Sequence, residues 1–217
     1  MNKREFKDRV YGELAAVTKA MANPHRLEII DLLAQGPFSV EQIAGYTGLS
    51  VANASQHLQT LRKARLVSVV RNGNFILYSL SDDDVFRTWV SLRELGTAFH
   101  AEIEKLVKNF REGTKAIDAQ TMVSMLEKDE VILIDVRPEE EYRRGHIHRA
   151  LSMPVDRLPG ELSNLPRDRQ IVAYCRGPFC AYADEAVRLL LENDYQAVRL
   201  EEGYREWVLA GYPAQTA

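Results

Sequence analysis

Apolar residues near the start of the chain recur every three or four positions. This is the spacing of one face of an α-helix, so it predicts an amphipathic first helix. The positions that make up this face are Phe6, Val10, Leu14, Val17 and Met21.

Capping signals divide the following residues into three short helices. The pair Asn23-Pro24 supplies an N-cap and a first-turn proline for a helix that runs to residue 34. Ser39 and Gln42 have the spacing of a capping box for a helix that ends near Gly45, and Ser50 can cap the next helix. The predicted buried face of this last helix consists of Val51, Ala54, Leu58 and Leu61.

Two apolar or β-branched runs follow, at residues 66–70 and 75–80. The Asn72-Gly73 pair between them tolerates the positive φ angles of a tight turn, which predicts a β-hairpin. A hairpin directly after a helix-turn-helix predicts a mainly α, winged helix-turn-helix domain with a β-wing.

A long helical pattern follows the hairpin and offers more apolar surface than a small three-helix core can cover. We expect this surface and the apolar face of the first helix to form a homodimer interface. The apolar positions of the long pattern are Val85, Phe86, Trp89, Leu92, Phe99, Ile103, Leu106, Val107 and Phe110.

The polar segment 111–115 contains a glycine and precedes a change of pattern. It predicts a linker between a first domain at 1–110 and a second at 116–217. In the second domain apolar runs alternate with helical stretches, which predicts an α/β domain with a mostly parallel sheet. The runs lie at 131–134, 171–174 and 197–200, and the helical stretches at 121–126, 183–191 and 204–209.

The composition is that of ordinary folded domains, with 46% hydrophobic and 27% charged residues, which excludes a disordered or collagen-like chain. No apolar run approaches the roughly 20 residues that cross a bilayer, and the N-terminus lacks a signal peptide, so we expect a cytoplasmic protein with no membrane partner.

The charge differs between the two halves of the chain. Residues 1–110 hold 14 Lys and Arg against 12 Asp and Glu, whereas residues 111–217 hold 14 against 19. Only the first domain therefore suits a polyanion.

The helix that follows Ser50 carries side chains suited to DNA. In a winged helix this element enters the major groove, and the wing touches the phosphate backbone. Hydroxyl, amide and imidazole groups can hydrogen-bond base edges, and cations can bind phosphates. The predicted DNA-binding residues are Ser50, Asn53, Ser55, Gln56, His57, Gln59, Thr60, Arg62 and Lys63 on the helix and Arg71, Asn72 and Asn74 in the wing.

The first domain resembles the ArsR/SmtB family of transcriptional repressors over residues 5–108. The resemblance implies a homodimer, built on the first and last helices, that binds a pseudo-palindromic double-stranded DNA operator and represses until an inducer arrives. The segments that carry it are Asn23 to Leu27, Ile43-Ala44, Gly48 to Ser50, Ser55 to Leu58, Leu61-Arg62, Leu66-Val67 and the wing from Gly73 to Tyr78.

This domain departs from the metal-sensing members of that family. Many of those use a cysteine pair on the third helix, whereas this domain has no cysteine. For a second family site, on the last helix, Asp84, His100, Glu102 and Glu104 are the nearest residues, but their spacings do not match. We therefore expect neither a metal nor a cofactor. An alternative is that the winged helix serves only for dimerisation or protein docking.

A different chemistry is expected at Cys175 in the second domain. Cys175 and Cys180 are the two cysteines of the chain, which is not the disulfide framework of a secreted protein. Cys175 lies between the end of a strand and the start of a helix, where free backbone N–H groups and the neighbouring Arg176 favour a thiolate. We therefore expect Cys175 to have a lowered pKa and to act as a nucleophile.

The second domain resembles the rhodanese family over residues 116–214. The resemblance implies that Cys175 accepts sulfur and that Asp135 and Arg137 support the active-site loop. This loop comprises Arg176, Gly177, Pro178, Phe179, Cys180 and Ala181. The matching segments are Leu133 to Arg137, Glu141-Tyr142, Gly145 to Ile147, Ala150 to Pro154, Tyr174 to Gly177, Glu202 to Trp207 and Ala210 to Pro213.

The loop departs from the family at Cys180, where a basic residue often binds the sulfonate of thiosulfate. Thiosulfate is therefore a poor donor candidate, and Cys180 can instead be a resolving thiol that attacks a persulfide on Cys175. The alternative for Cys180 is a small buried apolar residue. Phosphatase-like relatives of the fold have an arginine where this chain has Ala181, which argues against a phosphatase or an arsenate reductase.

Three functions stay open on these residues. The preferred one is a DNA-binding repressor whose rhodanese domain senses or transfers sulfane sulfur through Cys175, with a sulfane-sulfur donor or a low-molecular-weight thiol as partner. The second is a sulfurtransferase that uses the winged helix mainly to dimerise. The third is a regulator with a catalytically silent rhodanese domain.

Overall fold

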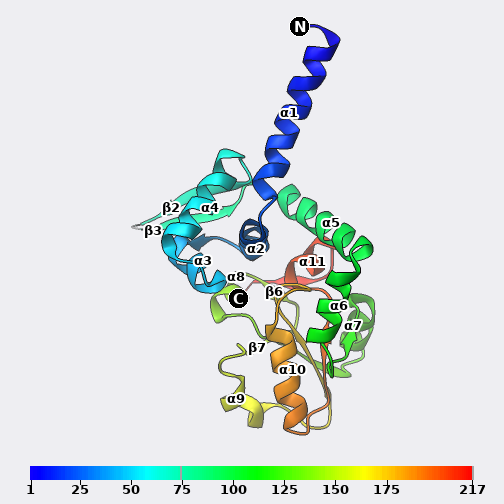
Figure 1. Cartoon of the computed structure of the whole chain (residues 1–217). Helices are drawn as coiled ribbons and strands as arrows, with labels where there is room; N and C mark the ends of the chain where they lie inside the picture. Colours follow the sequence, from blue (N-terminus) through cyan, green and yellow to red (C-terminus); the bar gives the residue numbers. More distant parts are fainter. Residues whose placement is uncertain (74, 217) are drawn as a thin grey trace. The chain divides into compact units, whose positions relative to one another are not determined.

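The computed structural model describes residues 1–73 and 75–216. These residues divide into two compact units, Met1–Gly96 and Thr97–Ala217, and each contains both helices and strands, as the labels β2 and β3 in the first and β6 and β7 in the second show in Figure 1. None of the helices in the described part of the chain is long and apolar enough to span a membrane.

Helix α1 (Lys3–Met21) begins at a capping box formed by Asn2 and Glu5. Ala20 and Met21 in its last turn are buried, and Figure 1 shows the rest of the helix extending beyond the other elements of its unit. The predicted apolar face is consequently exposed in the single chain, with Phe6 at 52% and Leu14 at 57%. This face is available for a partner surface.

Helices α2 (Pro24–Leu33), α3 (Val40–Thr47) and α4 (Val51–Lys63) form the core of the first unit. Their predicted caps are confirmed: the side chains of Asn23, Ser39 and Ser50 each accept a bond from a first-turn backbone N–H. The buried residues of this core include Ile29, Ile30, Ile43, Ala54, Leu58 and Leu61.

Two details of these helices differ from the prediction. Helix α3 continues past Gly45 to Thr47 and ends at Gly48, whose φ of 66° is the left-handed conformation that terminates helices. Val51 is 46% exposed because it is the first residue of α4 and projects past the core that covers Ala54 and Leu58.

The predicted hairpin is present as β2 (Val67–Asn72) paired antiparallel with β3 (Phe75–Leu80). A short strand, β1 (Phe38–Ser39), adds to the other side of β3. Helix-turn-helix followed by this small sheet is the predicted winged helix-turn-helix.

The long helical pattern after the wing is interrupted at His100. Helix α5 (Asp83–Phe99) buries Val85, Phe86 and Trp89 in the first unit, and α6 (Ala101–Phe110) begins a new helix that belongs to the second unit. The division between the two units lies at Gly96, within α5 and a few residues before this break. Residues 97–110 of the expected first domain and the expected linker 111–115 therefore fall in the second unit. The apolar period continues across the break, so the sequence pattern gives no sign of it.

The second unit is built on a parallel sheet with the strand order β4-β9-β8-β5-β7, as predicted. Its strands are β4 (Ala116–Ile117), β5 (Val131–Asp135), β7 (Leu151–Ser152), β8 (Gln170–Tyr174) and β9 (Ala197–Leu200). Strands β6 (His146–Ile147) and β10 (Ala214–Gln215) form a separate antiparallel pair.

Apolar side chains cover both faces of the parallel sheet, as is usual for such sheets. One core includes Ile134 and Ala173 with Val187 of α10, and the other includes Leu133 and Val172. The remaining helical elements are α7 (Ala119–Glu127), α8 (Glu139–Arg144), α9 (Leu158–Glu161), η1 (Leu162–Asn164), α10 (Tyr182–Glu192) and α11 (Tyr204–Leu209).

Candidate functional site

Cys175 lies directly after β8, at the carboxyl end of the sheet, and the loop after it leads into α10. In open parallel sheets this edge is where ligands bind. Cys175 is only 3% exposed, whereas Cys180 is partly exposed. Both thiols are free.

The two cysteines interact with each other and with backbone groups of the loop. The Cys175 thiol donates to the backbone carbonyl oxygens of Cys180 at 3.6 Å and Gly177 at 3.9 Å, and it is also hydrogen-bonded to the Cys180 side chain. Backbone N–H groups of Gly177 and Ala183 favour the charged form of Cys175. The N–H groups of Arg176 and Tyr182 point to Cys180. Helix α10 is preceded by Ala181, which has no side-chain acceptor, so the first N–H groups of the helix are directed to sulfur.

The expected lowered pKa of Cys175 is wrong for this reduced state. Burial and the hydrogen bond to Cys180 raise the pKa of Cys175 well above its ordinary value. The pKa of Cys180 is lowered, first by the hydrogen bond from Cys175 and then by backbone N–H groups and the charge of Arg176. The pair therefore forms its thiolate at Cys180, with the Cys175 thiol as the donor.

Arg176 is paired with a buried carboxylate rather than left free in the loop. Its Nε lies 3.0 and 3.1 Å from the two carboxylate oxygens of Glu141, and its Nη2 lies 2.5 Å from Oε1. Glu141 is fully buried, and the bidentate geometry fixes the guanidinium. The charge of Arg176 is therefore largely balanced before any ligand arrives.

Asp135 and Arg137 form a second buried ion pair beneath the loop. Arg137 Nη2 lies 2.6 Å from Asp135 Oδ2 and donates to the carbonyl of Gly145 at 2.8 Å. The hydroxyl of Tyr174 donates to the same Asp135 oxygen at 2.6 Å. Because Tyr174 immediately precedes Cys175, this network fixes the start of the loop. We infer that Asp135 and Arg137 support the site without touching a substrate.

A close backbone contact holds the other side of the loop. The N–H of Tyr204 donates to the carbonyl of Cys175 at 3.1 Å. A Cβ atom at Gly203 would lie 2.1 Å from the carbonyl oxygen of Arg176, so glycine is required for this approach. The ring of Tyr204 also lies beneath Arg137, with its centroid 4.4 Å from the guanidinium carbon.

Residues from elsewhere in the fold bind the loop, and the sequence did not predict these contacts, although Glu141 lies in one of the segments that resemble the rhodanese family. Glu141 belongs to an acidic run that is typical of a solvent-exposed helix, yet it is buried. Arg111 donates to the carbonyl of Pro178, and Asp184, 1% exposed, accepts from the Thr114 hydroxyl at 2.9 Å. Arg111 and Thr114 were expected in a linker, and no local pattern marks them.

The predicted DNA-binding residues lie on α4 and the wing. Asn53, Gln56, Gln59, Arg62 and Lys63 are exposed, as base or phosphate contacts require. The other predicted positions are exposed Ser50, Thr60 and Arg71 and partly buried Ser55 and His57, whereas Asn74 and the side chain of Asn72 lie outside the described part of the structure.

Some of these side chains already have partners within the domain. Ser50 caps α4 through the N–H of Asn53, and the Thr60 hydroxyl donates to the carbonyl of Gln56 at 3.1 Å. The ring of His57 lies beside His25, with 5.6 Å between centroids. Burial and the charges of Arg26 and His25 lower the pKa of His57, which favours a neutral imidazole at pH 7.

Within the described residues, no group of three or more His, Cys, Asp or Glu side chains is arranged to hold a metal ion. This holds for the predicted nearest candidates Asp84, His100, Glu102 and Glu104. The chemistry-bearing groups of the second unit are thus the two thiols, the loop amides and the buried ion pairs.

Comparison with protein families matches both halves of the chain. Residues 23–69 match the model of the bacterial regulatory protein, arsR family, and residues 118–210 match the rhodanese-like domain. The first match contains the helix-turn-helix, and the second contains Asp135, Cys175 and Gly203.

Individual proteins match in the same way. The chain is 39% identical over 202 residues to the HTH-type transcriptional regulator Rv0324 of Mycobacterium tuberculosis, covering 93% of this chain and 89% of that protein. It is 31% identical over 99 residues to a sulfurtransferase of Allochromatium vinosum, covering 45% of this chain and 91% of that protein.

Among solved structures, the chain is 36% identical to a solution structure of Mb0332 from Mycobacterium bovis, covering 46% of this chain and 91% of that one, with a TM-score of 0.43. That structure is described as a homodimeric winged helix-turn-helix DNA-binding domain of a possible ArsR-family transcriptional regulator. Because the Rv0324 match extends over 93% of the chain, this protein belongs to the family of HTH-type transcriptional regulators that join an ArsR-family DNA-binding domain to a rhodanese-like domain.

Proposed function

We propose that this regulator is a homodimeric repressor whose affinity for its DNA operator is set by sulfane sulfur bound at the Cys175 and Cys180 thiols. The observation that carries the proposal is the hydrogen-bonded thiol pair in the rhodanese loop of a DNA-binding chain.

DNA binding is supported by the exposed amides of Gln56 and Gln59 and the exposed cations Arg62 and Lys63 on α4. Amides can read base edges in the major groove, and the cations at the end of the helix can bind phosphates. The exposed apolar faces of α1 and α5, including Leu14 at 57% and Leu92 at 42%, support a homodimer.

The sulfur chemistry needs only the two thiols and the donor. The outer sulfur of a persulfide R–S–SH passes to the loop thiols and leaves a persulfide on Cys175, while R–SH is released with the proton of the Cys175 thiol. Attack of Cys180 on the inner sulfur of the Cys175 persulfide then forms a Cys175–Cys180 disulfide and expels HS⁻. The donor sulfur is reduced to sulfide while the two thiols are oxidised.

Thiosulfate is a poor donor for this loop for two reasons. The side chain of Cys180 is either an uncharged thiol or a negatively charged thiolate. In neither form does it supply the positive charge that would pair with a sulfonate. Arg176, the cation beside the nucleophile, is already held by Glu141. A persulfide, which needs no cationic pocket, is the better match.

An operator titration tests the proposal. A DNA duplex selected from a random pool by the reduced protein is titrated with reduced and persulfide-treated wild type and with Cys175→Ser, and the same samples are analysed by peptide mass spectrometry. We expect treatment to weaken operator binding by wild type at least tenfold and to leave Cys175→Ser unchanged. Sulfur on the thiols with unaltered operator affinity would contradict the sensing function.

A second candidate is a sulfurtransferase, and the similarity to the Allochromatium vinosum sulfurtransferase favours it. This function predicts repeated transfer of sulfur from a persulfide to an acceptor such as cyanide, with Cys175→Ser inactive. Multiple turnovers per protein together with unaltered DNA binding would favour this candidate over the regulator. No sulfur uptake at all would favour a silent rhodanese domain.

A further inference from the structure

Helix α6 and the active-site loop line a pocket of about 180 Å³ within the second unit, and this pocket is open to solvent. We call it the α6 pocket. Its wall is mostly apolar, and Cys180 forms part of it. The apolar lining residues are Leu106, Val107, Phe110, Pro178 and Phe179.

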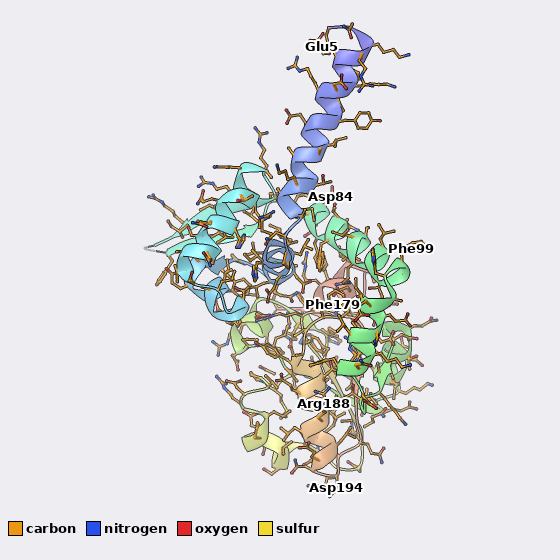
Figure 2. The ribbon with its side chains drawn as sticks, viewed as in Figure 1. Glu5, Asp84, Phe99, Phe179, Arg188 and Asp194 are labelled. Atoms are coloured by element: carbon orange, nitrogen blue, oxygen red, sulfur yellow. The ribbon has the colours of Figure 1, made fainter. Side chains whose placement is uncertain are left out.

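Several contacts fix α6 against α10 and so form the pocket. Arg188 of α10 donates to the carbonyl of Phe110, and its guanidinium carbon lies 5.1 Å from the centre of the Phe110 ring. Figure 2 labels Arg188 on α10 and Phe179 of the loop, both in the unit that contains α6. The pocket is therefore a feature of the second unit alone.

The charged groups of the pocket wall neutralise each other. Arg111 Nε lies 3.7 Å from Asp184 Oδ2, and Arg111 also donates to the carbonyl of Pro178. Asp184 has a further ion pair with Arg199 at 3.5 Å. Such a wall suits an uncharged, apolar group better than an anion, because both side-chain charges are already paired.

The size of the pocket limits what it can hold. An engineered apolar cavity of roughly 150 Å³ binds benzene, so about 180 Å³ accommodates a phenyl or a short alkyl group. A peptide-sized thiol such as glutathione fits this wall less well, because its two carboxylates and its ammonium group find no unpaired charge there.

Of the two cysteines, Cys180 forms part of the wall of this pocket, and Cys175 does not. Cys180 is partly exposed and lines the pocket, whereas Cys175 is 3% exposed and belongs to the buried core. We propose that Cys180 is the thiol that first captures sulfur, and that the α6 pocket binds the apolar body of an alkyl or aryl persulfide donor. This inference rests on the proposed function and names its donor class and its entry thiol.

Sulfur reaches Cys175 in two steps, capture by Cys180 and relay to Cys175. The Cys180 thiolate attacks the outer sulfur of R–S–SH, the donor S–S bond breaks, and R–SH leaves with the persulfide proton. The Cys175 thiol, which is hydrogen-bonded to Cys180, then takes the outer sulfur of the Cys180 persulfide and gives its proton to the departing Cys180 sulfur. The products are a Cys175 persulfide and a Cys180 thiol. The lowered pKa of Cys180 supplies the thiolate for the first step.

The test measures sulfur capture by the full chain, using rapid quenching and peptide mass spectrometry. The donors are n-propyl persulfide and glutathione persulfide, which have the same reactive group and different bodies. The variants are Cys175→Ser and Cys180→Ser for the entry thiol, and Leu106→Glu and Val107→Phe for the pocket. Leu151→Glu, which changes a 49% exposed leucine outside the pocket wall, is the matched control for the 61% exposed Leu106.

We expect Cys175→Ser to accumulate sulfur on Cys180 at the wild-type rate and Cys180→Ser to capture it at least tenfold more slowly. Capture from n-propyl persulfide should exceed capture from glutathione persulfide at least tenfold in wild type. Leu106→Glu and Val107→Phe should remove that preference, and Leu151→Glu should keep it.

Each opposite result overturns a defined part of the inference. Wild-type capture by Cys180→Ser would make Cys175 the entry thiol, and equal rates with both donors would exclude the apolar pocket; in either case the proposed function stands. Wild type with neither added sulfur on its cysteines nor a Cys175–Cys180 disulfide would instead overturn the proposed function itself. Sulfur capture as expected, with unaltered operator affinity, would retain the inference and reject sensing.

Discussion

At the scale of single residues, the two thiols of the loop have opposite environments. Cys175 is buried and donates a hydrogen bond, whereas Cys180 is partly exposed and accepts bonds from two backbone N–H groups. The division of labour between them follows from this difference: Cys180 is the more acidic and more accessible thiol, and Cys175 is the protected one.

This difference predicts how alkylation depends on pH. Because the pKa of Cys180 is lowered and that of Cys175 is raised, iodoacetamide should modify Cys180 at pH values below the ordinary thiol value of 9.0 and leave Cys175 unmodified there. Peptide mass spectrometry between pH 5 and 9 measures both. In Cys175→Ala the hydrogen bond is lost, so the Cys180 profile should move to higher pH. If the pH dependence of Cys180 alkylation is the same in Cys175→Ala as in wild type, the hydrogen bond from Cys175 does not lower the pKa of Cys180.

The buried pair of Asp135 and Arg137 predicts a large stability effect. Asp135→Ala leaves the fully buried Arg137 charge without its partner, so the free energy of unfolding should fall by about 3–5 kcal/mol. Urea unfolding, followed by Trp207 fluorescence in a Trp89→Phe background, measures the second unit. Arg157→Ala removes an exposed ion pair with Glu139 and should cost less than about 1 kcal/mol. Similar losses in the two variants would contradict the role of the buried pair.

At the scale of elements, the active-site loop is held between β8, α10 and the turn before α11. Tyr174 fixes its start through Asp135, the turn at Gly203 contacts its first peptide groups, and Arg111 binds the carbonyl of Pro178. Because the loop is fixed at several points, it has little freedom to adjust when Cys175 or Cys180 gains sulfur or forms a disulfide. Residues 111–114, which directly follow α6, are among those points.

The turn at Gly203 gives an element-scale prediction. In Gly203→Ala the new Cβ would lie 2.1 Å from the Arg176 carbonyl oxygen and 2.4 Å from Gly177 Cα, so the loop must move away from the sheet. We expect sulfur capture to slow at least tenfold while the circular dichroism spectrum is retained. Gly160→Ala is the control, because a Cβ there meets no atom within 4 Å. Equal capture rates in the two variants would show that the close approach has no role.

At the scale of the whole molecule, the exposed apolar residues of α1 require a partner surface. Phe6, Val10 and Leu14 are 52%, 41% and 57% exposed, an arrangement that is costly in water for a helix held only by its last turn. A homodimer is the assembly that the proposed function needs, because two DNA-reading helices match a two-fold symmetric operator.

If α1 forms the dimer interface, a charged side chain on its apolar face should disrupt dimerisation and weaken operator binding. Leu14→Glu places a carboxylate on the apolar face, so the protein should shift from dimer to monomer and bind the operator at least tenfold more weakly. Sedimentation velocity gives the mass, and a DNA titration gives the affinity. Arg9→Glu introduces the same side chain at another exposed position of α1 and should remain dimeric. If the Leu14→Glu variant remains a dimer, the apolar face of α1 is not the dimer interface.

The sequence by itself determined the winged helix and the main strands and helices of the parallel-sheet domain. Helical spacing, the caps at Asn23, Ser39 and Ser50, and the Asn-Gly turn predicted the winged helix, because each depends on residues a few positions apart. The alternation of apolar runs and helices likewise predicted the parallel sheet, and it placed Cys175 between a strand and a helix. These are local properties of the chain.

Only the tertiary structure decided how the site works. Glu141 lies 35 positions from Arg176, and Arg111 lies 67 positions from Pro178, so no local pattern relates them. The same holds for the assignment of α6 to the second unit. Burial, which depends on the whole fold, placed the thiolate on Cys180 rather than Cys175, because a charge is least stable where the fold excludes water.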